Sequence, residues 1–597
     1  MPPLEKPFHW LAQAARYRAF WLGLPLLLYV WTITGPFVAD DLHLVLKAES
    51  YLRGESPAPG LFRFARTPEE WRLLRDRGDV PWWTPPVQRV DLFRPLAEWS
   101  FCLDMLLFGR NPTGHRLVSL AWFAIALICT RRLFLTACSD SARAGVATFL
   151  YGISQTLTQP ATFICNRSDL MAIAGTTLAA GAYCHSIRRA EGRPSTAPRD
   201  SPPGETEARS GLGLLLLAGI AYAFGLLSKE MAVGLGVVVV AHEAVRHFRR
   251  RTSPDLPRPA RHVPGMITLT LGAMAAAYVI FYAVTRPWHL GLADDAGRNN
   301  ISALAAAPRA LPLYIAVWTT GFPISALIQA GAVPVFTVGA AGLLVLALGA
   351  RHLRRLLRSD PAGGFFLLWA AVFLGIALLT IPETRVLSLA TVGWAYFLSG
   401  LLSSRVEQPP LVPLWLRHWL FAVNGAVSIC CAIAFARLQT TWEQQSRQAL
   451  AGYLAASKTP LRDGDTLIVA QPQSEMELLF AGDRLEFVSG RRDCALVFLT
   501  LPSGGANLRW INDRSLKATS VQGDLLGSPT QRFLLGPGWK PVPGYKFHHR
   551  DFEAEVAAVS GDGRVQELDF RFKEPITSPR LRFIAPRSNT PPHLDNR

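Results

Sequence analysis

The chain has 597 residues, of which 50% are hydrophobic and 18% are charged, and its mean hydropathy is +0.20. This composition excludes a disordered chain, a fibrous repeat and a small disulfide-stabilised domain. The formal net charge of +17 would suggest a nucleic-acid partner in a soluble protein. Most of the basic residues lie between apolar segments, however, so we interpret them as topology signals and expect no nucleic-acid partner.

Apolar segments long enough to cross the hydrocarbon core of a bilayer recur along the chain as far as residue 435. The first follows Arg16 and Arg18 and lacks a small-residue cleavage site, which favours a retained helix over a signal peptide. Residues 303–328 are interpreted as an interfacial or re-entrant segment, because a full span there would move the following arginines to the opposite side. We predict about eleven spans, at residues 19–37, 114–134, 143–158, 169–187, 211–227, 231–246, 264–284, 331–350, 364–380, 386–402 and 415–436.

Lys and Arg are distributed unequally between the loops that these spans create. The N-terminal segment and the short loops after the even-numbered spans carry far more of them than the opposite short loops. The positive-inside rule therefore places the N-terminus in the cytoplasm. An odd number of spans then places the C-terminal segment outside. Because the composition is rich in Arg and Ala, we expect a bacterial source and an integral protein of the inner (cell) membrane.

Two segments on the expected outer side are large. The first outer loop, residues 38–112, contains at 67–70 a pattern typical of a capped helix start. We therefore predict a polytopic α-helical transmembrane domain at 1–437, including this loop, and a small extracytoplasmic β-rich domain at 438–597. A fragment that begins near residue 455 should fold by itself. The β-like runs of the C-terminal segment are separated by Gly and Pro turns and lie at 466–470, 495–501 and 567–572.

An acidic pair, Asp40 and Asp41, directly follows the first span. One interpretation is a solvated end cap of that span. Another is a reactive site, because close like charges keep one carboxylate basic enough to accept a proton, or allow the two to share a divalent cation. The residues alone leave these alternatives open.

Charged residues also stand in tight turns on the same expected face. Arg167 and Asp169 precede the fourth span, and Lys229 and Glu230 separate the fifth from the sixth. Charges at such depth are costly and tend to mark pathways, sites or internal pairs. The structural alternative is an Arg167–Asp169 or Lys229–Glu230 ion pair that only neutralises a turn. With Arg385 between the ninth and tenth spans, the cations could instead bind the phosphate of a lipid-linked substrate while a carboxylate handles an acceptor hydroxyl.

Several of these residues lie in motifs that resemble those of GT-C membrane glycosyltransferases. The most similar branch is that of the protein O-mannosyltransferases, the transmembrane and TPR-containing mannosyltransferases and their bacterial relatives. The chain departs from this pattern at Asn166, where glycine is usual, and no TPR array follows. The motifs that carry the resemblance are the acidic pair, Phe93-Arg94-Pro95-Leu96, Asp104, Leu107-Phe108-Gly109, Asn111-Pro112, His115-Arg116-Leu117-Val118, Asn166-Arg167-Ser168-Asp169-Leu170, Leu227-Ser228-Lys229-Glu230 and Glu383-Thr384-Arg385-Val386-Leu387-Ser388-Leu389.

The resemblance implies a GT-C-like fold and a transferase that moves a sugar, mannose or another hexose, from a polyprenyl-phosphate donor to a glycan, lipid or protein acceptor on the outer face. It implies that Asp40 or Asp41 is the general base. No cofactor is assigned, since two carboxylates alone do not select a metal ion. The alternatives are a transporter or flippase for a lipid-linked saccharide, and a membrane anchor that displays a binding domain. The residues expected to bind substrate are Arg167, Lys229 and Arg385 at the donor phosphate, with Arg94, His43, Asp169 and Glu230 in the same site.

Overall fold

The computed structural model describes residues 10–584 apart from residue 12, 85–89, 139, 192–204, 253–262, 287–299, most of 331–359, 361, 381–382, 403–413, 458, 502–504, 522 and 528–540. The chain forms two compact units. We call the first, Met1–Gly35, Phe93–Asp294 and Asn299–Arg437, the helical unit. The second, Pro36–Leu92, Asp295–Arg298 and Leu438–Arg597, is called the sheet unit. The sequence predicts that the first outer loop is part of the transmembrane domain, whereas the structure groups most of it with the C-terminal segment.

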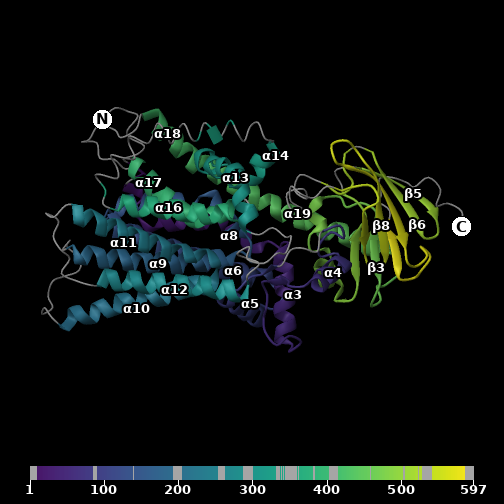
Figure 1. The fold of residues 1–597 in the computed structure, drawn as a ribbon, viewed down its shortest axis with the longest axis horizontal. Helices are drawn as coiled ribbons and strands as arrows, with labels where there is room; N and C mark the ends of the chain where they lie inside the picture. The colour runs from purple at the N-terminus through teal and green to yellow at the C-terminus, as the bar shows by residue number, and fades with distance from the viewer. Residues whose placement is uncertain are drawn as a thin grey trace. The chain divides into compact units, whose positions relative to one another are not determined.

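Long apolar helices dominate the helical unit (Figure 1). Within the described residues, seven helices are long and apolar enough to cross a membrane by length and composition. The protein is therefore a polytopic α-helical membrane protein, as the hydropathy pattern predicts. These seven correspond to α6 (Pro112–Cys138), α9 (Arg167–Ala190), α10 (Glu205–Ser228), α11 (Gly234–Thr252), α12 (Val263–Thr285), α17 (Ser388–Leu402) and the continuous helix that ends as α19 (Ser428–Ala456).

The other predicted spans differ from these in form. The segment expected at 143–158 is two short helices, α7 (Ser141–Gly152) and α8 (Gln155–Thr162). The break occurs because the hydroxyl of Ser154 accepts the amide of Thr156 at 3.3 Å and caps α8. Shorter apolar helices cover Ala19–Thr34, Ala310–Thr320 and Gly363–Leu378. The span expected at 331–350 lies almost entirely outside the described residues.

Helix α9 packs against both α6 and α10 in the helical unit, and α11 packs against α12 and α16 (Gly363–Leu378). Figure 1 shows these helices running side by side. Gly175 of α9 permits the close approach to α10, because a Cβ atom there would lie 2.6 Å from the carbonyl oxygen of Ala221. Small residues at such contacts are how membrane helices bring their backbones together. The packed bundle fixes where the helix ends, and the turns between them, lie.

The C-terminal part of the sheet unit contains two sheets. A parallel sheet has the order β10-β3-β4, and an antiparallel sheet has the order β5-β6-β9-β8-β7. The three predicted β-like runs each coincide with a strand or part of one, which confirms a C-terminal β-sheet region. The sequence did not reveal that helix α20 (Ala481–Ser489) connects β3 to β4 as a parallel crossover. The strands are β3 (Thr466–Val469), β4 (Ala495–Phe498), β5 (Ala506–Asn512), β6 (Ser515–Ser520), β7 (Lys546–His548), β8 (Phe552–Val559), β9 (Val565–Phe572) and β10 (Leu581–Ile584).

The first outer loop supplies further elements of the sheet unit. They are α3 (Asp40–Leu52), β1 (Arg63–Ala65), α4 (Pro68–Arg77) and β2 (Val90–Asp91). The predicted cap of α4 is present, since the Thr67 hydroxyl accepts the amide of Glu70 at 3.2 Å.

Two tryptophans of this loop, Trp82 and Trp83, are buried in the core that the strands form. The Trp82 ring lies 5.3 Å from the ring centre of Phe547 and 5.6 Å from that of Phe570. Its indole nitrogen donates to the carbonyl oxygen of Phe498 at 2.9 Å. The core of the sheet unit therefore contains residues that precede most of the membrane helices in sequence.

Trp82→Ala should lower the unfolding free energy of the sheet unit by about 3 to 5 kcal/mol, the usual cost of removing a buried Trp side chain. The fragment 455–597 lacks Trp82 and Trp83, which are part of this core. We therefore expect it to aggregate, in contrast to the independent folding that the sequence predicts. Urea titration of the purified full-length protein, followed by limited proteolysis, would measure the first effect. Ile511→Ala is a matched control because Ile511 is 59% exposed on β5. A soluble fragment with a native-like β-type circular dichroism spectrum would contradict this account.

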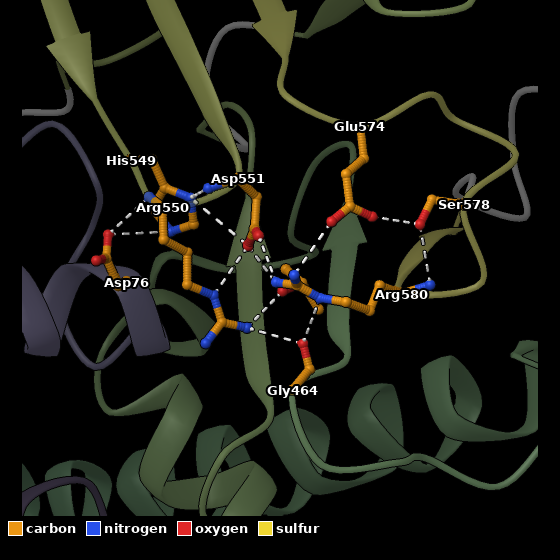
Figure 2. Close-up of polar contacts among 9 residues, drawn as sticks. Asp76, Gly464, His549, Arg550, Asp551, Glu574, Ser578 and Arg580 are labelled. Carbon is orange, nitrogen blue, oxygen red and sulfur yellow. Dashed lines mark hydrogen bonds and ion pairs between the residues drawn. The ribbon is translucent and has the colours of Figure 1, made fainter.

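Asp551, which is 5% exposed, is the centre of a polar network in the sheet unit (Figure 2). Its carboxylate accepts from Arg550 Nε at 3.0 Å, Arg580 at 3.1 Å and the Thr466 hydroxyl at 2.8 Å. Asp76 of α4 joins the network by accepting the backbone amide of Arg550 at 3.0 Å. The network thus ties α4 to the start of strand β3.

His549, beside this network, is a pH-sensitive element. Its ring is buried and stacks on Phe552 with 4.5 Å between ring centres, and its Nδ1 accepts the amide of Asp551 at 3.2 Å. Burial lowers the pKa of His549 from 6.5 to about 4. Between these values the unfolded chain binds a proton that the folded chain does not. The stability that the neutral ring contributes is therefore present above pH 6.5 and lost as the pH falls through about 4.

We expect His549→Gln to reduce the loss of stability of the sheet unit between pH 7 and pH 4.5. Urea midpoints at several pH values would measure this dependence. His548→Gln is the control, because the His548 side chain is 76% exposed. Identical pH dependence of the wild type and the His549 variant would show that another group is responsible.

Candidate functional site

The acidic pair lies in a strained turn at the start of α3. Ala39 has φ 46° and ψ −114°, close to the second position of a type II′ turn, which favours glycine. The amide of Asp41 closes this turn by donating to the carbonyl oxygen of Val38 at 3.0 Å. The Asp41 carboxylate is fully buried and accepts the amide of Val38 at 3.1 Å. Asp40 is half-buried, so the two carboxylates occupy different environments.

Within the described parts of the chain, no group of three or more His, Cys, Asp or Glu side chains is arranged to hold a metal ion. A cation shared by Asp40 and Asp41 stays a prediction.

His43, predicted to bind substrate, lies inside the sheet unit with 4% of its surface exposed. Its Nδ1 is 2.7 Å from a carboxylate oxygen of Asp483 on α20. Its ring stacks on Phe64 with 4.5 Å between ring centres. These contacts give His43 a place in the protein interior rather than on an open surface.

The charged turns of the helical unit form ion pairs between different segments. Arg94, which precedes α5 (Pro95–Phe108), contacts Glu230 through two nitrogen–oxygen contacts of 2.9 and 2.6 Å. Lys229 donates to Asp169 at 2.6 Å. The pairs are therefore not the local Arg167–Asp169 and Lys229–Glu230 pairs considered from the sequence. Each joins two segments that are distant along the chain.

Arg385 belongs to the same cluster. It contacts Glu383 and the side-chain oxygen of Asn166, and 27% of its side chain is exposed. Lys229 interacts electrostatically with both Arg94 and Arg385. Short 3₁₀ turns at Glu230–Val233 and Thr384–Leu387 start the helices that follow. We call Arg94, Lys229, Arg385, Asp169, Glu230 and Glu383 the charged cluster.

Arg167 has a different environment. Its guanidinium is fully buried and contacts Asp104 of α5 at 2.5 Å. It also donates to the hydroxyls of Ser119 and Ser100, each at 3.0 Å, and to the carbonyl oxygen of His115 at 2.7 Å. The contacts with Asp104 and His115 hold the Arg167 guanidinium inside the helical unit, and its contact with a donor phosphate stays a prediction. Both residues belong to the quoted first-loop motifs, but the motifs alone assigned them no function.

The structure thus brings together five of the residues predicted to bind substrate: Arg94, Lys229, Arg385, Asp169 and Glu230. Asp40, Asp41 and His43 belong to the sheet unit. The meeting of the acidic pair with the charged cluster stays a prediction.

No protein-family model matches the sequence, and comparison with curated protein sequences found no match. Among solved structures, the chain is similar to the Archaeoglobus fulgidus oligosaccharyltransferase in complex with Zn and sulfate, with 12% identity over 79% of this chain and 61% of that one and a TM-score of 0.42. The same enzyme tethered to an acceptor peptide has 14% identity, a TM-score of 0.35 and coverage of 75% and 63%.

The chain thus spans less than two thirds of the length of these archaeal structures. ArnT from Cupriavidus metallidurans bound to undecaprenyl phosphate has 12% identity over 92% of this chain and 97% of that one, with a TM-score of 0.32. All of these scores lie below 0.5, so the similarity by itself assigns no reaction to this chain.

Proposed function

We propose that this integral membrane protein is a GT-C-type glycosyltransferase. It transfers a sugar, mannose or another hexose, from a polyprenyl-phosphate donor to a glycan, lipid or protein acceptor on the outer face of a bacterial inner membrane. The observation that carries the proposal is the charged cluster, in which Arg94, Lys229 and Arg385 lie together at the turns of a membrane-helix bundle. Placing a charged side chain at such a depth costs free energy. Such charges therefore tend to mark pathways, sites or internal pairs.

The arginines of the charged cluster can bind a phosphate in place of their present carboxylate partners. Its three cations are offset by three carboxylates, of which Glu230 and Glu383 have side chains 32% and 38% exposed. Glu230 contacts Arg94 in the two-point geometry that guanidinium groups also use for phosphate. An incoming phosphate can therefore replace Glu230 on Arg94 and Glu383 on Arg385 while these carboxylates turn toward water. Lys229 stays paired with the deeply buried Asp169.

The proposed reaction needs one base and a stabilised leaving group. Asp40 accepts the proton of the acceptor hydroxyl as its oxygen bonds to the anomeric carbon of the sugar. The bond between that carbon and the phosphate oxygen breaks, and polyprenyl phosphate leaves with the bonding electrons. Arg94 and Arg385 stabilise the charge that develops on the phosphate. Attack on the face opposite the leaving group inverts the anomeric carbon.

The test is a transfer assay with purified full-length protein and a polyprenyl-phosphate sugar, analysed by mass spectrometry of glycans and lipid-linked sugars. The proposal expects a glycosylated product and free polyprenyl phosphate. Movement of the lipid-linked sugar across vesicles, without transfer, would instead support a transporter.

Topology can be tested by reporter fusions. An enzyme reporter that is active only outside the cytoplasm should function when fused after Asp79 or after Arg597. It should be inactive after Arg199 or Arg258, which we place in cytoplasmic loops. The reverse pattern would move the acidic pair to the cytoplasmic face and contradict the proposed site.

A further inference from the structure

Two non-glycine residues of the described chain have positive φ, Ala39 at 46° and Phe480 at 55°. Each directly precedes a helix of the sheet unit, Ala39 before α3 and Phe480 before α20. The contact between His43 Nδ1 and the Asp483 carboxylate joins the first turns of these two helices. Residues in such backbone conformations persist where the surrounding structure imposes them, and they cluster at functional sites.

The side chain of Asp483 is held on several sides. Besides its contact with His43, it accepts from Arg77 at 3.1 Å. Its backbone amide donates to the carboxylate of Asp79 at 2.7 Å. The carbonyl oxygen of Asp79 accepts the amide of Phe480 at 2.9 Å. The carboxylate that contacts His43 therefore has a fixed position in the sheet unit.

The other side of the acidic turn is held by α19. Arg447 donates to the carbonyl oxygen of Phe37 at 3.3 Å and to Glu443 at 3.0 Å. Glu443 also accepts from Arg484 of α20 at 3.1 Å, so that α19 and α20 are linked. The ring of Phe37 contacts Phe487 of α20 edge to face, with 5.9 Å between ring centres. Segments that follow residue 437 thus hold the chain three residues before and three residues after Asp40.

We propose that Asp483 and Arg447 are positioning residues for Asp40, and that the C-terminal segment is therefore a working part of the transfer site. This proposal rests on the proposed function. His43 lies three residues after Asp40 on one face of α3, where neighbouring side chains meet, and the two interact electrostatically. Holding His43 sets the rotation of the first turn of α3 and hence the direction of the Asp40 carboxylate. Misplacing a reacting group by about 1 Å can cost roughly 100-fold in rate.

The test compares Asp483→Ala, Asp483→Asn and Asp551→Ala in the purified full-length protein. Asp551 is the matched control, because it is also a buried, arginine-bound carboxylate of the sheet unit, and its partners Arg550, Arg580 and Thr466 lie outside α3. We expect Asp483→Ala to lower kcat by about 10- to 100-fold with the KM for the donor nearly unchanged. Asp483→Asn keeps an acceptor for His43 and should recover part of the rate. Asp551→Ala should keep the wild-type kcat per folded molecule.

Amide hydrogen exchange provides a readout that does not depend on activity. Residues 38–46 should exchange faster in Asp483→Ala than in Asp551→Ala. Unchanged kcat in Asp483→Ala, or equal losses in both alanine variants, would overturn the positioning role. If the wild type transfers no sugar, the proposed function fails, and the exchange comparison alone decides whether Asp483 holds the acidic turn.

Discussion

Asp40→Asn is expected to lower the rate of sugar transfer by about 100- to 10,000-fold, the usual loss when a general base is removed. The amide is close in size to the carboxylate but does not accept a proton at neutral pH. Expression and donor binding should stay close to wild type, because Asp40 lies outside the charged cluster that we assign to the phosphate. Rates under saturating donor, with a separate donor-binding assay, would measure both effects.

Asp41→Asn is the matched comparison. The Asp41 carboxylate is buried and accepts the amide of Val38, and an asparagine oxygen can accept the same hydrogen bond. We therefore expect a loss of at most about tenfold, in line with the small net worth of one hydrogen bond. If only Asp41→Asn lost activity, Asp41 and not Asp40 would be the general base. Near-normal transfer in both variants and in the double variant would contradict the proposed glycosyltransferase mechanism.

Arg167→Met should produce a folding defect. It leaves Asp104 as a buried carboxylate without its guanidinium partner, and breaking a buried ion pair from one side costs about 3 to 5 kcal/mol. We expect poor yield in detergent and a lowered midpoint of thermal unfolding. The double variant Arg167→Met with Asp104→Leu should recover part of this stability, because it removes both buried charges.

Arg385→Gln provides the contrast. The Arg385 side chain is partly exposed at the charged cluster, so its replacement should be tolerated by the fold. Loss of a charged contact worth about 1.5 to 3 kcal/mol corresponds to roughly 10- to 150-fold weaker donor binding. If Arg167→Met instead folded normally and only lost donor affinity, Arg167 would bind the donor and would not be needed for folding.

Local patterns in the sequence were sufficient for the membrane helices. A hydrocarbon core of about 30 Å requires about 20 apolar residues in one helix, so α6, α9 and α12 could be placed from hydropathy alone. The start of α4 was also predictable, because Thr67 caps it with a hydrogen bond to a residue three positions away. The strands β3, β4 and β9 were visible as short apolar or alternating runs between turns.

The partners of the charged residues depended on the tertiary structure. Lys229 pairs with Asp169 and Arg94 with Glu230, although adjacent charges within each turn offered simpler pairs. The choice follows from helix packing, which brings the start of α9 beside the turn after α10. Sequence distance carries no information about such neighbours.

The division of the chain into units also required the structure. By sequence, Trp82 belongs to an outer loop. In the structure, its ring packs against the antiparallel sheet β5-β6-β9-β8-β7, at Phe547 and Phe570. The different burial of Asp40 and Asp41 also depends on the tertiary structure, since Ala39 before them adopts a strained backbone that alanine does not favour by itself. The sequence by itself determined most of the membrane helices, the cap of α4 and the strands β3, β4 and β9, because these depend on near neighbours. Core membership and the orientation of each carboxylate depend on long-range packing, which the tertiary structure alone decided.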